Sequence, residues 1–156
     1  MDYLTSLSLV VAATSVLWGV YVYQRQMNAQ LFIEYTKRYD QVMQSYPEGV
    51  RRIRLHSEGE PPPESGELSA VVLRYLNLCS EEFYLWKRGY LAPDIWRIWV
   101  QEMRRTLASP LYRREWPKVA SEFESYREFS DYVAEAQRPA PPNRPLQPTR
   151  PYGPRG

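Results

Sequence analysis

Cysteine and histidine are almost absent from the sequence, which has one of each in 156 residues, Cys79 and His56. A single cysteine excludes an intramolecular disulfide framework, and one cysteine with one histidine cannot form a zinc site of the Cys/His type. His56 falls in a predicted linker and Cys79 on the core side of a predicted helix, so a Cys/His nucleophile is not expected. The chain also lacks a Gly-rich phosphate loop, HExxH and GxSxG. We therefore expect no cofactor and no metal, and catalysis is not favoured.

The chain also lacks a large net charge of either sign. The chain carries 20 Lys+Arg against 18 Asp+Glu, a formal net charge of +2. Residues 24–138 hold 17 basic and 17 acidic side chains, whereas residues 139–156 hold seven prolines, three arginines and no acid. A neutral body does not suit a protein that coats nucleic acid, so no nucleic acid is expected as a partner. The Pro-rich tail, 139–156, is predicted to be disordered.

Charged residues are absent from residues 3–23, YLTSLSLVVAATSVLWGVYVY. A helix of that length reaches about 32 Å, which is enough to cross a hydrocarbon core of about 30 Å. Trp18, Tyr21 and Tyr23 lie near its end, as in an interfacial aromatic belt. We therefore predict that residues 1–23 form a transmembrane anchor whose partner is the lipid bilayer.

The basic residues flank this segment on one side only. Arg25, Lys37 and Arg38 follow it, whereas Asp2 and the α-amino group precede it. The positive-inside rule then predicts a single-pass protein with its N-terminus outside and its C-terminus in the cytoplasm. A cleaved signal peptide is the competing interpretation, but it normally has basic residues before the apolar segment and an A-x-A-like site after it. A buried core helix is the other, and the apolar residues around the whole circumference disfavour it.

Small residues recur in the anchor at Ser8, Ala12, Ser15 and Gly19, after Thr5, at spacings of three and four. This spacing places them on one stripe of a helix, where two membrane helices could approach closely and form a homo-oligomer. The alternative is that small residues are merely common in membrane helices.

Helical periodicity dominates the body, residues 24–138. Apolar side chains recur every three or four residues through 24–46, 67–89, 93–107 and 109–126, and again in a last short helix at 129–136. No segment shows the alternation of a half-buried strand. The predicted fold class is therefore all-α, with the N-terminal transmembrane helix continuing into a small bundle of about four helices.

Proline and glycine mark the predicted boundaries. Pro47 and Gly49 end the first helix and begin a linker at 48–66 that contains three consecutive prolines. Gly89 is a typical residue after a helix C-terminus, and Pro93 suits a first helical turn. Pro117 is expected to kink or interrupt its helix.

Three residues of the 67–89 helix are candidates for a functional or structural polar core: Glu82, Asn77 and Trp86. Helical geometry places Glu82 on the apolar flank beside Trp86, while neighbouring Glu81 is expected to point outward. A carboxylate there needs a partner or has a raised pKa. A structural bond to an Arg or a Tyr hydroxyl is one interpretation, and a polar spot in a small pocket is the other. Asn77 lies on the opposite side, where it could cap or bridge to another element or simply be solvated.

The segment YLNLCSEEFYLWKRGYL, residues 75–91, resembles a motif of an uncharacterised family of small bacterial membrane proteins. In that family a Tyr-Leu-Asn helix is followed by an acidic-aromatic stretch, Lys/Arg-Gly and a Trp-rich helix, and the similarity covers roughly residues 30–135. The resemblance implies one membrane helix, a cytoplasmic α-helical domain of unknown function, and the bacterial inner membrane as the location. It implies no activity.

Together these patterns favour a membrane-anchored domain that serves non-catalytic protein–protein interaction or regulation, with a protein partner or a second copy. The alternative is a membrane-associated enzyme or small-ligand regulator with an aromatic pocket around Glu82.

Overall fold

The computed structural model describes residues 3–53 and 60–139, and within these ranges every regular element is a helix. The predicted all-α fold class is confirmed. The chain divides into two compact units, Met1–Thr36 and Lys37–Gly156. Most of the Pro-rich tail, residues 140–156, lies outside the described residues.

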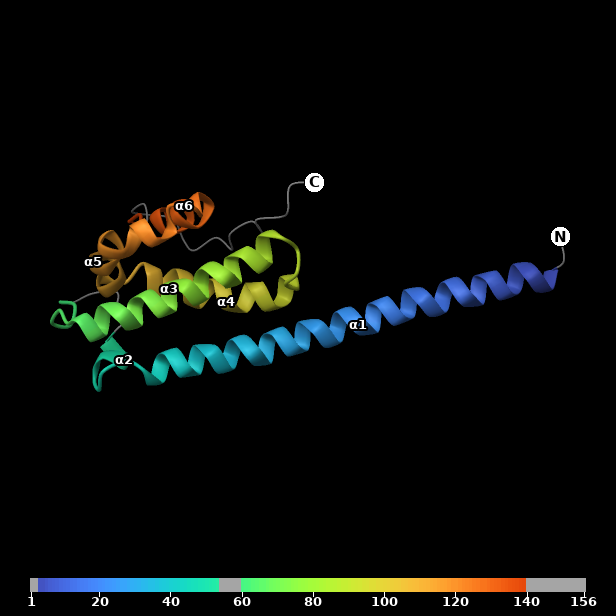
Figure 1. The fold of residues 1–156 in the computed structure, drawn as a ribbon, viewed down its shortest axis with the longest axis horizontal. Coiled ribbons are helices and arrows are strands. Elements are labelled where there is room, and N and C mark those ends of the chain that lie inside the picture. Colours follow the sequence, from blue (N-terminus) through green and yellow to red (C-terminus); the bar gives the residue numbers. More distant parts are fainter. Residues whose placement is uncertain (1–2, 54–59, 140–156) are drawn as a thin grey trace. The chain divides into compact units, whose positions relative to one another are not determined.

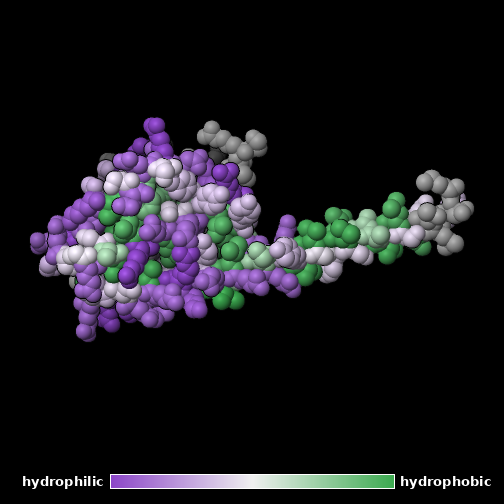
Figure 2. All heavy atoms as spheres, viewed as in Figure 1, coloured by the Kyte–Doolittle hydropathy of each residue, from purple (hydrophilic) through white to green (hydrophobic). Residues whose placement is uncertain are grey.

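The first unit consists of the greater part of α1, a helix of 42 residues that spans Tyr3–Gln44. At 1.5 Å per residue α1 is about 63 Å long, twice the thickness of a hydrocarbon core. It is the one helix in the described part of the chain that is long and apolar enough to cross a membrane. None of its apolar window is buried, and Figure 2 shows hydrophobic side chains on the surface of this segment. A core helix of a soluble protein would bury that window instead.

The second unit begins with the last turns of α1. Met43 is buried in the core, and so is Tyr46, just after the helix. The chain then turns at Pro47 and Gly49, where Gly49 has a φ of 84°, a conformation that costs glycine little. This break lies where the sequence predicts it. A short helix, α2, spans Val50–Ile53 within the predicted linker, and residues 54–59 lie outside the described residues.

Helix α3, Gly66–Lys87, is closed at both ends by local hydrogen bonds. The Ser65 hydroxyl accepts a bond of 3.1 Å from the backbone N–H of Leu68, which satisfies one of the free donors at the N-terminus. At the other end Gly89 has a φ of 73°, and Tyr90 N–H donates to the carbonyl of Leu85 at 2.9 Å. This is a Schellman motif, and Gly89 occupies the position predicted for it.

The chain continues through α4, Pro93–Leu107; α5, Pro110–Val119; the 3₁₀ helix η1, Ala120–Phe123; and α6, Arg127–Ala136. Pro93 and Pro110 each lie in a first turn, where the missing N–H is not needed. Pro117 lies inside α5, and the helix continues past it to Val119 before tightening into η1. The α-helix therefore runs through the proline and ends two residues after it.

Helices α3 to α6 pack against one another (Figure 1). They enclose an aromatic core. Phe83 of α3 lies at its centre, with its ring 4.8 Å from Tyr132 and 6.0 Å from Phe129, centroid to centroid. Trp86 and Trp96 stack with an interplanar angle of 6° and a centroid separation of 5.4 Å, which joins α3 to α4. Offset and edge contacts of this kind add to the free energy gained by burying the rings.

One carboxylate, Glu115 of α5, is completely buried inside a polar network. It accepts hydrogen bonds from the Ser69 hydroxyl at 2.8 Å, Arg114 Nε at 2.8 Å and Lys118 Nζ at 3.2 Å. Arg114 also donates to the carbonyl of Pro62 at 2.6 Å. Burial raises the pKa of Glu115, but the bonds from Ser69, Arg114 and Lys118 outweigh it and lower the pKa below its usual value. The ionised carboxylate thus ties α5 to α3 and, through Arg114, to the segment before α3.

Replacing Glu115 with Ala should lower the free energy of unfolding by roughly 2–4 kcal/mol, because Arg114, Lys118 and Ser69 lose their shared acceptor. The matched control is Glu122→Ala on η1, whose side chain is exposed, and it should change stability by less than about 0.5 kcal/mol. Chemical unfolding of the full chain in detergent micelles, followed by near-UV circular dichroism of the aromatic core, measures both. Equal stabilities for the two variants would contradict the role given to Glu115.

Candidate functional site

The three predicted residues of α3 occupy different environments. Asn77 is exposed, whereas Glu82 is 8% exposed and Trp86 is 7% exposed. Trp86 contributes to the aromatic core through its stack on Trp96. The structure therefore places Glu82 and Trp86 on the inner side of α3 and Asn77 on the outer side, as helical geometry predicts.

The residue next to Glu82 joins the end of α1 to α3. Arg38 donates from both of its terminal nitrogens to the carboxylate of Glu81, and the Nη2–Oε1 distance is 2.9 Å. A two-point guanidinium–carboxylate pair of this kind fixes orientation as well as distance. Glu81 is expected from the sequence to point outward, and its side chain is indeed 43% exposed, but it is held by Arg38.

Glu82 itself has no hydrogen bond and no ion pair to the residues that the structure describes. Burial raises its pKa to about 8, the charge of Arg38 acts in the opposite direction, and the charge of Glu81 raises it further. The arginine that could have neutralised Glu82 is bound to Glu81 instead. At neutral pH the carboxyl group is therefore mostly protonated.

The interior beside Glu82 is lined by neutral hydroxyl and thiol groups. The hydroxyls of Tyr46 and Tyr112 share a hydrogen bond, and the Tyr112 ring lies 5.3 Å from that of Tyr75. Burial raises the pKa of Tyr75, Tyr112 and Cys79 well above their ordinary values. A thiol that stays protonated is a poor nucleophile, so Cys79 behaves as a small apolar side chain of the core.

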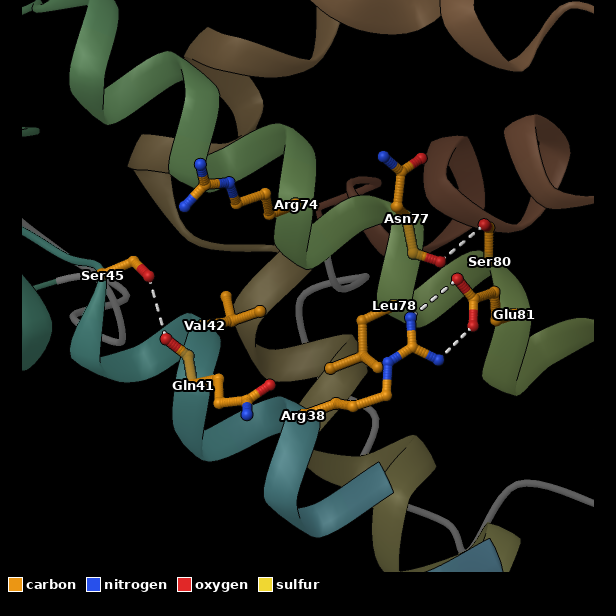
Figure 3. A pocket seen from close by; sticks show the side chains of 9 residues that line it. All are labelled: Arg38, Gln41, Val42, Ser45, Arg74, Asn77, Leu78, Ser80 and Glu81. Carbon is orange, nitrogen blue, oxygen red and sulfur yellow. Dashed lines mark hydrogen bonds and ion pairs between the residues drawn. The ribbon is translucent and has the colours of Figure 1, made fainter. Parts of the chain in front are cut away.

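Asn77 lies beside a groove between the end of α1 and the middle of α3, within the second unit (Figure 3). The groove has a volume of about 490 Å³ and is open to solvent. Neither Glu82 nor Trp86 lines it. Its residues are Arg38, Gln41, Val42, Ser45, Arg74, Asn77, Leu78, Ser80 and Glu81.

The small residues of the anchor, Ser8, Ala12, Ser15 and Gly19, are exposed on α1. A Cβ atom added at Gly19 would meet nothing within 4 Å, so no other part of the described chain approaches this position. Self-association through the stripe stays a prediction.

Among the described residues, no three His, Cys, Asp or Glu side chains come close enough together to hold a metal ion. The sequence does not predict that Arg38 pairs with Glu81. In the sequence Arg38 is recognisable only as a positive charge near the predicted membrane segment. Arg38 and Glu81 are 43 residues apart, and helical periodicity says nothing about pairs between helices.

No family model matches the chain, and no curated protein or solved structure matches it either.

The protonated Glu82 predicts an unusual dependence of stability on pH. Between pH 4.5, the ordinary pKa, and about 8, the unfolded chain ionises this group while the folded chain keeps it protonated. Stability should therefore fall as pH rises through this window, by about 1.4 kcal/mol per unit. In Glu82→Gln this loss disappears, so between pH 5 and 8 the variant should gain roughly 2–4 kcal/mol relative to the wild type.

Unfolding of the full chain in micelles at a series of pH values measures this difference. The control is Glu81→Gln, which releases Arg38 and removes a neighbouring negative charge. Both effects lower the pKa of Glu82, so in this variant the loss of stability should end at a lower pH. Parallel stability curves for the wild type and Glu82→Gln would show that Glu82 is ionised in the folded protein.

Proposed function

We propose that the chain is a single-pass membrane protein whose helical body binds protein partners, without catalysis, at the cytoplasmic face of a bacterial inner membrane. The observation that carries this proposal is the composition of α1. One uninterrupted helix has an exposed apolar surface in the first unit and contributes Met43 to the core of the second.

The flanking charges support the orientation. Arg25, Lys37 and Arg38 all follow the apolar segment, and basic residues within about 15–20 residues of a membrane helix favour the cytoplasm. The bacterial inner membrane is what the resemblance of residues 75–91 implies. A cleaved signal peptide passes the same test of length and hydropathy, and the missing A-x-A-like site argues against it.

The state of the body supports binding rather than chemistry. Its nucleophile candidate, Cys79, is buried with a raised pKa. Its groove is open and polar, which suits a protein segment better than a small molecule. A second candidate function, a small-ligand regulator or enzyme centred on Glu82, is favoured by one observation: a buried carboxyl group whose pKa is raised to about 8.

Alkaline carbonate extraction tests the anchor. The full chain should stay in the membrane pellet, because the 21 uncharged, mostly apolar residues 3–23 hold it there without any partner. A variant with Leu9, Val16 and Leu17, all exposed on α1, replaced by Lys should be released. Recovery of the wild-type chain in the soluble fraction would contradict the proposal.

Crosslinking in native membranes tests the interaction. A photoreactive residue at an exposed site of the body should yield discrete crosslinked proteins, and the same bands should survive Glu82→Gln. If the interaction is instead regulated by a ligand at Glu82, the crosslinks should change with this variant. Crosslinking to lipid alone would refute protein binding.

A further inference from the structure

The groove between α1 and α3 contains polar groups that the folded chain does not use. Arg74, Asn77 and Gln41 line it with exposed side chains. None of these three side chains forms a hydrogen bond or an ion pair with the described residues. Figure 3 shows Arg74 extended along α3, away from the Arg38–Glu81 pair. Two amides and a guanidinium are thus available along one groove as hydrogen-bond donors.

The charge of the lining selects the kind of ligand. Arg38 and Glu81 neutralise each other through their two hydrogen bonds. Arg74 is the remaining charged residue of the groove, so the lining has a net positive charge. An arginine that pairs with no carboxylate among the described residues is suited to bind one from outside, in a two-point contact.

The shape of the groove favours a peptide over a small molecule. Sites for small ligands enclose most of the ligand surface and are mainly apolar. This groove is open, has polar walls, and has Val42 and Leu78 as its apolar residues. Such a surface fits a segment that lies between two helices, with one apolar side chain over Val42 and an acidic one beside it.

Other anionic or intramolecular occupants fit less well. Residues 139–156 of the chain carry three arginines and no acidic side chain, so Arg74 repels them. Nucleic acid requires several phosphate contacts, and lipid headgroups contribute about 1 kcal/mol for each basic residue near the surface. One available arginine in a concave groove is too few for either.

We propose that this groove binds an acidic segment of a partner protein, through Arg74 and the amides of Asn77 and Gln41. This inference rests on the proposed function, because it names the surface through which the body interacts.

A peptide display library selected on the full chain in nanodiscs of zwitterionic lipid tests the site. The selected peptides should share an Asp or Glu next to an apolar residue. Their affinity should fall about tenfold in Arg74→Glu, because an attraction becomes a repulsion, and it should weaken with added salt. Arg74→Lys should retain part of the binding, because it keeps the charge but loses the two-point contact. The matched control is Arg105→Glu, which reverses an exposed arginine on α4 outside the groove and should leave affinity unchanged.

Arg74 has no partner among the described residues, so its variants should fold, and their near-UV circular dichroism checks this. Peptides without acidic residues, equal binding to wild type and Arg74→Glu, or no selected peptide at all would each overturn the groove as the site. Binding of the body to anionic vesicles that depends on Arg74 would overturn it in favour of lipid. Crosslinked partners in native membranes would still stand in these cases, so failure of the groove is distinguishable from failure of the proposed function.

Discussion

The rest of the structure depends on one constraint: a single helix has to satisfy two different environments. Toward its N-terminus, α1 exposes valine, leucine and tryptophan side chains that no part of the described chain covers. Leaving such side chains in water costs about 1.5–3 kcal/mol each, and soluble monomers rarely expose them contiguously. Toward its C-terminus, the same helix contributes Met43 to a core that also contains Tyr46. The proposed bilayer would cover the first part of α1, whereas the folded body covers side chains of its last turns.

The pairing of Arg38 with Glu81 connects this constraint to the chemistry of the body. It fixes the last turns of α1 against α3 through two hydrogen bonds. Beside this pair, burial raises the pKa of Glu82 to about 8, although the charge of Arg38 acts in the opposite direction. An acidic partner bound next to Arg38 would interact electrostatically with Arg38, Glu81 and Glu82.

Local patterns in the sequence predict most of the fold, because helix length and helix ends depend on neighbouring residues. The apolar periodicity of α3, its Schellman end at Gly89 and the break at Pro47 all follow from such patterns. Contacts between helices do not follow from local patterns. The Tyr46–Tyr112 hydrogen bond joins residues 66 apart, and Glu115 draws its partners from two helices. For the same reason the burial of Glu82 is predictable from its place on α3, whereas the capture of Arg38 by Glu81 is not.

Solvent accessibility along α1 tests the central claim most directly. Spin labels placed one at a time from Tyr3 to Gln44, in the full chain with Cys79 replaced by Ala and reconstituted in lipid vesicles, report collisions with oxygen and with a water-soluble nickel complex. Across residues 3–23 oxygen should reach the labels and nickel should not. From about Arg25 onward nickel should reach the labels more readily than oxygen. From Lys37 onward accessibility should alternate, because one side of the helix is buried against the body. Nickel reaching Val11 and Val16 as freely as it reaches exposed Asp40 on the same helix would contradict the membrane anchor.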